Sequence, residues 1–171
     1  MPANASSSLT RRDFLRSRVS APLPEFRPPW SDEATIQTAC TGCGDCIAAC
    51  PENILELDGN RRVRVALRGG DCTFCRACAE TCAEPVFDLN QSPPWPVVAE
   101  ISGNCLMVAG ISCQLCTDIC EPRALRLDLG VRPVGAIRLD ATACTGCGAC
   151  LSLCPNDAIT LSDPRMKAPV T

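Results

Sequence analysis

The cysteines are the feature that most constrains how this chain of 171 residues can fold. There are 16 of them, and every one belongs to one of four sets of four. The sets are Cys40, Cys43, Cys46 and Cys50; Cys72, Cys75, Cys78 and Cys82; Cys105, Cys113, Cys116 and Cys120; and Cys144, Cys147, Cys150 and Cys154. They are separated by 21, 22 and 23 residues. This regular period indicates internal duplication of one cysteine-bearing unit.

The spacing within the sets indicates iron–sulfur chemistry. Sets one, two and four read C-x2-C-x2-C-x3-C, and in sets one and four a proline follows directly, as in the run that ligates [4Fe-4S] clusters. Three thiolates two residues apart can point inward from one short loop, and the glycines between them permit the backbone angles required. Set three has seven residues between Cys105 and Cys113, so its first cysteine departs from the pattern. We expect three clusters from sets one, two and four, and a fourth from set three.

Two other uses of the cysteines fit the spacing less well. A disulfide-rich secreted scaffold needs an export signal and irregular spacing, and neither is evident. Zinc sites usually take two cysteines from each of two distant knuckles and do not need three in a C-x2-C-x2-C run. The chain has no histidine, which removes His-containing zinc, haem and Rieske sites and the usual general base.

Composition indicates a fold that depends on its cofactors. Hydrophobic residues make up 46% of the chain but aromatic residues only 4%, a small supply of large core side chains. Metal binding contributes directly to folding when the site does not exist in the unfolded chain, so we expect an apo form with little tertiary structure. The formal net charge is −3 before cluster thiolates are counted, which disfavours nucleic-acid binding. No run of 18 apolar residues predicts a membrane span.

The first thirty residues differ from the rest of the chain. They carry five arginines and two acids, a net charge of +3. The stretch from Thr10 to Arg16 resembles a twin-arginine export motif, but the residues after it are charged and proline-rich rather than apolar, so we do not expect export. We expect residues 1–30 to form a basic, flexible leader that either contacts a partner or is simply disordered.

The remaining chain predicts an α+β, ferredoxin-like iron–sulfur fold of two duplicated two-cluster units, with short helices and β-hairpins. The expected domains are a first unit at 31–92, a second at 93–162 and a tail at 163–171, with the proline-rich stretch 90–96 as the boundary. Strands are predicted at 35–38, 54–57, 61–67, 86–89, 97–101, 124–127, 136–139 and 159–161.

The pairing of the sets stays open between two alternatives. Tandem pairing joins set one with two and set three with four, so that Cys50 reaches the second cluster and Cys82 the first. Nested pairing joins one with four and two with three, since sets one and four are the most alike. Tandem pairing is favoured because closing a short loop costs less entropy.

Several features of the sequence together resemble a known family. The four sets, the wide third set ending Cys120-Glu-Pro122, the pair Arg11-Arg12 and the motif Arg27-Pro-Pro-Trp-Ser31 are similar to the NapF family of ferredoxin-type proteins, accessories of the periplasmic nitrate reductase. The resemblance covers most of the chain. It implies a cytoplasmic protein that contacts the catalytic molybdenum subunit before export and helps to assemble or reduce that subunit's iron–sulfur cluster. Arg11 and Arg12 would then belong to the partner-binding arm.

The residues themselves indicate one-electron transfer and no catalytic site. There is no phosphate-binding loop, no histidine and no evident nucleophile outside the cysteines, so we expect no intrinsic enzyme activity. Two roles remain open: an assembly or accessory factor for a client enzyme, and an electron-transfer subunit in a standing redox chain. The basic leader and the family resemblance favour the first.

Overall fold

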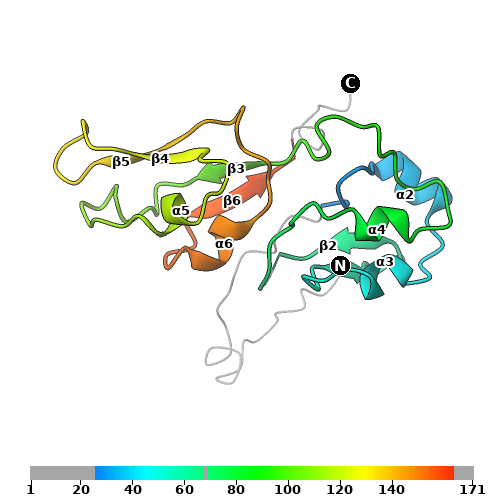
Figure 1. Ribbon diagram of the computed structural model, residues 1–171. Coiled ribbons are helices and arrows are strands. Elements are labelled where there is room, and N and C mark those ends of the chain that lie inside the picture. The colour runs from blue at the N-terminus through cyan, green and yellow to red at the C-terminus, as the bar shows by residue number, and fades with distance from the viewer. Residues whose placement is uncertain (1–25, 68, 164–171) are drawn as a thin grey trace, which may run out of the picture.

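The computed structural model describes residues 26–67 and 69–163. Arg11, Arg12, the leader up to residue 25 and the tail from residue 164 lie outside that part of the chain. The described residues form two lobes joined end to end (Figure 1), and both lobes mix short helices with antiparallel strand pairs, in agreement with the predicted α+β class. No helix among the described residues is long and apolar enough to cross a membrane.

The first lobe holds one strand pair and three short helices. Its elements are α2 (Glu33–Ala39), α3 (Asp45–Ala48), β1 (Leu55–Leu57), β2 (Val63–Val65) and α4 (Ala77–Glu80). Strands β1 and β2 pair antiparallel with Leu55 opposite Val65, which is the predicted hairpin with shorter strands. Asp58 closes its turn, because its Oδ1 accepts hydrogen bonds from the backbone N–H groups of Asn60 and Arg62, both 2.9 Å away.

The strand predicted at 35–38 is wrong, because these residues lie in helix α2. Asp32 is the N-cap: its Oδ1 accepts the Thr35 N–H at 2.8 Å, and the Thr35 hydroxyl accepts the Asp32 N–H at 3.2 Å. This reciprocal pair is a capping box with threonine in the third position. Ile36 is the residue that the helix buries, with no exposed surface. One apolar residue in a short segment left no periodicity from which to distinguish helix from strand.

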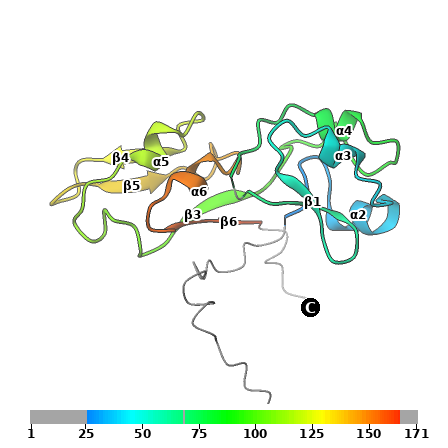
Figure 2. The same cartoon turned by 90° about the horizontal axis from the view of Figure 1, so that it is seen from below.

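The second lobe is closed by its first and last strands. Its elements are β3 (Val98–Ile101), α5 (Leu115–Asp118), β4 (Leu125–Asp128), β5 (Ala136–Leu139), α6 (Ala149–Leu153) and β6 (Ile159–Ser162). Strand β3 pairs antiparallel with β6, and β4 with β5 (Figure 2). These four strands match the predicted ones to within a residue or two.

The strand predicted at 86–89 does not form. Val86 is buried, but its N–H bonds to the carbonyl of Glu84 in a tight turn, and the Asp88 N–H bonds to the carbonyl of Trp30. The backbone of this stretch is therefore satisfied locally and by an earlier segment, so it does not pair with another strand.

That earlier segment, residues 26–31, belongs to the folded part rather than to the leader. Phe26 and Trp30 are each only 4% exposed, and Phe26 forms an isolated β-bridge with Val65. The Trp30 N–H donates to the carbonyl of Pro94 at 2.7 Å, which ties this lead segment to the proline-rich stretch. The expected leader boundary at residue 30 is thus too late.

Candidate iron–sulfur sites

The sixteen cysteines surround four cavities, each lined by four of them. Site 1 has Cys40, Cys43, Cys46 and Cys82; site 2 has Cys72, Cys75, Cys78 and Cys50; site 3 has Cys105, Cys113, Cys116 and Cys154; site 4 has Cys144, Cys147, Cys150 and Cys120. Three cysteines of every site come from one set, and the fourth is the last cysteine of the neighbouring set. The structure therefore brings the sets together as the tandem alternative predicts, and the nested alternative is wrong.

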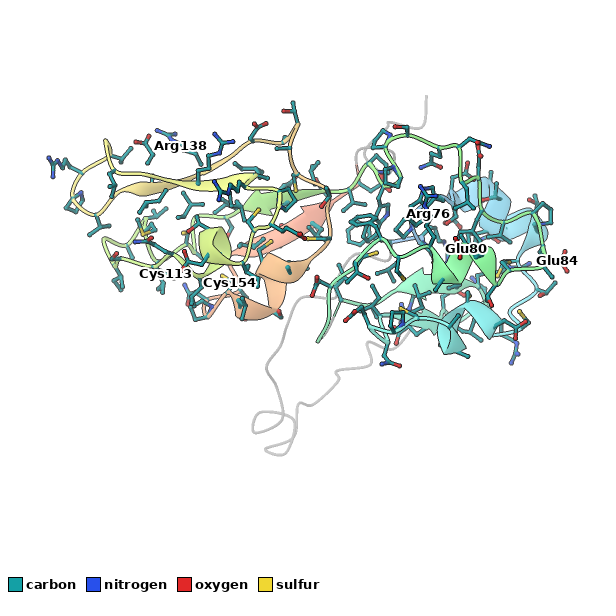
Figure 3. The ribbon with its side chains drawn as sticks, viewed as in Figure 1. Arg76, Glu80, Glu84, Cys113, Arg138 and Cys154 are labelled. Atoms are coloured by element: carbon teal, nitrogen blue, oxygen red, sulfur yellow. The ribbon has the colours of Figure 1, made fainter. Side chains whose placement is uncertain are left out.

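Short helices carry out this exchange. In each set the third cysteine lies in a one-turn helix and the fourth follows the helix, so the fourth projects toward the other site of its lobe. Helix α3 packs against α4, and α5 against α6. Figure 3 labels Cys113 and Cys154, which lie in the same lobe and line site 3 together although 41 positions separate them. The exchange links the two sites of a lobe, because each helix carries a cysteine of one site and is followed by a cysteine of the other.

Glycines shape the loops of sets one and four. Gly42 and Gly146 have φ of +70° and +73°, and a Cβ on them would collide with the carbonyl oxygens of Arg61 and Val97. Only glycine combines this left-handed backbone with so close an approach of another chain segment. The glycines between these cysteines are therefore needed for packing as well as for backbone conformation.

Set two adopts the same loop without glycine. Phe74 and Arg76 occupy the positions of the two glycines, with φ of +54° and +68°. Non-glycine residues in this region are strained and persist only where their surroundings hold them. Here the Phe74 ring packs edge-on between Trp30 and Trp95, with centroids 6.2 and 6.5 Å away, and the Arg76 guanidinium lies 5.7 Å from the centroid of the Trp30 ring.

Sequence reasoning missed this aromatic support of site 2. Its members are Phe26, Trp30, Phe74 and Trp95, and Trp30 and Phe74 line the cavity of site 2 directly. The available signal was the replacement of both loop glycines in set two by larger residues. It indicated that contacts elsewhere in the fold must offset the backbone strain of those two residues.

The wide gap in set three does not remove Cys105 from its site. Residues 106–110 form turns, and Cys105 and Cys113 still line one cavity. Met107 is 5% exposed, and its Sδ accepts the Cys113 N–H at 3.2 Å, which holds the far end of the loop in place. Val108 and Ile111 at the tip of the loop are 72% and 54% exposed.

Burial makes the unliganded thiols poor acids. Burial first, and then the neighbouring cysteines, raise the pKa of Cys46, Cys78 and Cys150 to about 12. The same causes raise the pKa of Cys72 and Cys116 to about 11. Without iron these five groups are neutral thiols at pH 7, so metal binding must displace their protons.

Backbone groups also point at the sulfurs of the second lobe. The N–H groups of Ala99, Leu125 and Ala158 donate to the Sγ atoms of Cys144, Cys120 and Cys154 at 3.4, 3.5 and 3.2 Å. Hydrogen bonds to ligand sulfurs stabilise the thiolate and tune the potential of a bound cluster.

The donor set suits a polynuclear cluster. Each cavity is partly open to solvent, and its four cysteines stand around that space. Among the described residues, no group of three or more Cys, Asp, Glu or His side chains is arranged to hold a single metal ion. Four sulfurs spread around a cavity of this kind fit a group with several irons, which has no need of sulfurs converging on one point.

Comparisons with known proteins agree with this geometry. A family model described as a 4Fe-4S dicluster domain matches residues 39–86 and 111–164. The first stretch contains sets one and two, and the second contains set four and set three without Cys105. The matched stretches therefore correspond to the two lobes.

Curated relatives cover nearly the whole chain. The ferredoxin-type protein NapF of Escherichia coli (strain K12) is 36% identical over 152 residues, 88% of this chain and 93% of the relative. NapF of Haemophilus influenzae is 38% identical over 167 residues, 91% of this chain and 95% of the relative. The methylamine utilization ferredoxin-type protein MauM of Methylobacillus flagellatus is 29% identical over 162 residues, 82% of this chain and 68% of the relative. The chain is therefore a 4Fe-4S protein and belongs to the NapF family of ferredoxin-type proteins.

Proposed function

We propose that the protein holds four [4Fe-4S] clusters, one in each of sites 1 to 4, with the four cysteines of each site as ligands. The observation that carries the proposal is the exchange of the last cysteine between neighbouring sets, because it completes four sulfur ligands around every cavity. A bound [4Fe-4S] cluster supplies reversible one-electron chemistry. The residues supply the thiolates, the backbone N–H groups at the sulfurs and the apolar surroundings that set the potential.

The proposed role is that of an accessory protein for the periplasmic nitrate reductase. Its similarity to NapF proteins and the chemistry of its sites support a cytoplasmic protein that contacts the catalytic molybdenum subunit before export. There it would assist assembly or reduction of the subunit's iron–sulfur cluster. The alternative is an electron-transfer subunit in a standing redox chain. We propose no intrinsic enzyme activity, because the sites supply electrons and no group that acts on an organic substrate.

The number of clusters is tested by iron and labile-sulfide analysis of anaerobically purified protein. Four clusters correspond to about sixteen irons per chain. The variant Cys105→Ser should lose the cluster of site 3 and fall to about twelve irons. The matched control is Ser112→Ala, which lies in the same loop and removes no sulfur. A wild-type value near twelve would show that site 3 does not load.

The role is tested by capture of the catalytic subunit before and after it receives its own cluster. The accessory role predicts that this protein captures the immature subunit and that its loss leaves the subunit short of iron. The double variant Arg11→Ala, Arg12→Ala should weaken capture. Its control, Arg126→Ala with Arg132→Ala, removes two exposed arginines at the β4–β5 hairpin and should not. The redox-chain alternative would be favoured if the protein captured the immature and the mature subunit equally and transferred electrons to the mature enzyme as fast as that enzyme turns over.

A further inference from the structure

The two lobes meet at cysteines of different sites. The backbone N–H of Cys72 donates a hydrogen bond to the carbonyl of Cys147 at 2.8 Å. Cys72 lines site 2 in the first lobe, and Cys147 lines site 4 in the second. One peptide hydrogen bond therefore joins two site-lining residues across the boundary between the lobes.

Packing around this bond is tight on both sides. Gly148 is the N-cap of α6 with φ +91°, and a Cβ built on it would lie 2.6 Å from Cδ1 of Leu67. Leu67 is 6% exposed and precedes the loop that carries Cys72. The equivalent glycine of the first lobe, Gly44, has φ +93° as the N-cap of α3 and nothing within 4 Å of its Cβ position. The site 4 loop is thus packed against the other lobe, and the site 1 loop is not.

The arrangement of helices agrees. In Figures 1 and 2, α6 lies nearer the first lobe than α5 does. Within the lobes, sites 1 and 2 are linked by the exchanged cysteines Cys50 and Cys82, and sites 3 and 4 by Cys120 and Cys154. No such exchange joins site 1 or site 3 to the opposite lobe.

We propose that the four sites form one row in the order 1–2–4–3, with the Cys72–Cys147 contact as its centre and with Leu67 and Gly148 as the residues that position it. This order differs from the order along the chain. It makes sites 1 and 3 the two ends of the row, where a donor and an acceptor would each meet the protein. The inference rests on the proposed occupancy of the sites, and it adds that sites 2 and 4 are magnetically coupled when both are reduced.

The test compares Gly148→Ala with Gly44→Ala in the full, loaded chain. Both variants place a Cβ on the left-handed N-cap of an equivalent helix and so carry the same backbone strain, but only the first pushes against Leu67. The readout is the dipolar broadening of the EPR spectrum of fully reduced protein, with iron content measured alongside. At wild-type iron content, Gly44→Ala should keep the part of the broadening that comes from sites 2 and 4. Gly148→Ala should lose the part that comes from sites 2 and 4, and the added change Leu67→Ala should restore it.

If the Gly148→Ala chain does not bind its clusters, a second measurement still tests the proposal. The variant Leu67→Ala carries no backbone strain, and its control Leu57→Ala removes the same atoms beside site 1. Hydrogen exchange at the Cys72 amide should accelerate in Leu67→Ala and stay unchanged in Leu57→Ala.

The possible outcomes separate this inference from the proposed function. Suppose that Gly44→Ala and Gly148→Ala both keep full iron content and show equal broadening. That result would contradict the proposed order of the sites and would leave the proposal of four clusters intact. A Cys72 amide that exchanges in loaded wild-type protein at the rate of an unstructured peptide would also overturn it. A wild-type chain without about sixteen irons would instead remove the proposed occupancy.

Discussion

At the scale of single residues, the four cysteine loops reach one geometry by two chemical routes. Sets one and four use glycine at left-handed positions, whereas set two uses Phe74 and Arg76. A left-handed non-glycine residue costs roughly 1 to 2 kcal/mol. The edge-on contacts of Phe74 and the contact of Arg76 with Trp30 offset that cost, since aromatic pairs and cation–π pairs each contribute about 0.5 to 1.5 kcal/mol.

This balance predicts opposite effects of two substitutions at Arg76. Arg76→Ala loses the contact with Trp30 but keeps the strained backbone, so it should destabilise the loaded protein by about 0.5 to 1 kcal/mol. Arg76→Gly loses the same contact but relieves the strain, so it should be at least as stable as the wild type. The measurement is the denaturant midpoint for loss of visible absorbance under anaerobic conditions. An alanine variant as stable as the glycine variant would show that the backbone here is not strained.

At the scale of elements, one ion-paired arginine attaches the lead segment to the β1–β2 hairpin. Arg27 donates from Nη1 to Asp58 Oδ2 at 3.0 Å and to the Val63 carbonyl at 2.9 Å, and from Nε to Glu33 Oε2 at 2.6 Å. Burial alone would raise the pKa of Asp58, but hydrogen bonds from the Arg62 backbone and the Arg27 side chain outweigh it, and the pKa lies below its ordinary value. The hydrogen bond from Arg27 likewise lowers the pKa of Glu33. Because both pKa values are depressed, the stability from these pairs is complete at neutral pH and is lost only as the pH falls below about 4.

Removing this arginine should therefore destabilise the first lobe. Arg27→Ala leaves the Asp58 carboxylate, whose side chain is 4% exposed, without its cation, at an expected cost of about 1 to 3 kcal/mol. The matched control is Arg138→Ala, because Arg138 pairs with Asp128 on the surface, where such a pair contributes about 0 to 1 kcal/mol. Thermal loss of visible absorbance at pH 7 measures both. Equal shifts in the two variants would contradict a structural role for the lead segment.

At the scale of the whole molecule, the cavities and the core are continuous. One cluster of buried residues runs through both lobes and contains Cys40, Cys46 and Cys150 beside aliphatic and aromatic side chains. Since the cysteines are part of this core, an occupied site contributes to folding, and a site that loses its metal removes packing as well as charge balance. We therefore retain the expectation of an apo form with little tertiary structure.

Tryptophan fluorescence offers a local test of this coupling. The chain has two tryptophans, and both belong to the aromatic group that supports site 2. Cys75→Ser should empty site 2, and fluorescence should rise because a bound cluster absorbs at the wavelengths of tryptophan emission and quenches it. Cys113→Ser empties site 3 in the other lobe and should raise it much less. Removal of all iron with a chelator should give the largest rise and loss of near-ultraviolet circular dichroism. Equal responses of the two variants would indicate that the tryptophans do not report on site 2.

The amino-acid sequence by itself determined the local chemistry of this protein. The cysteine spacing indicated iron–sulfur loops, and short apolar stretches indicated strands β1 to β6. Loop geometry and the pairing of β1 with β2 and of β4 with β5 depend on nearby residues, whereas β3 pairs with β6 at the far end of its lobe in the sequence. Only the tertiary structure decided that residues 35–38 form a helix, that residues 86–89 form turns and that Phe26 to Trp30 pack inside. It also decided which site each fourth cysteine joins and that Cys72 meets Cys147. Those outcomes depend on packing between segments that are far apart in the chain, and residue spacing carries no record of such contacts.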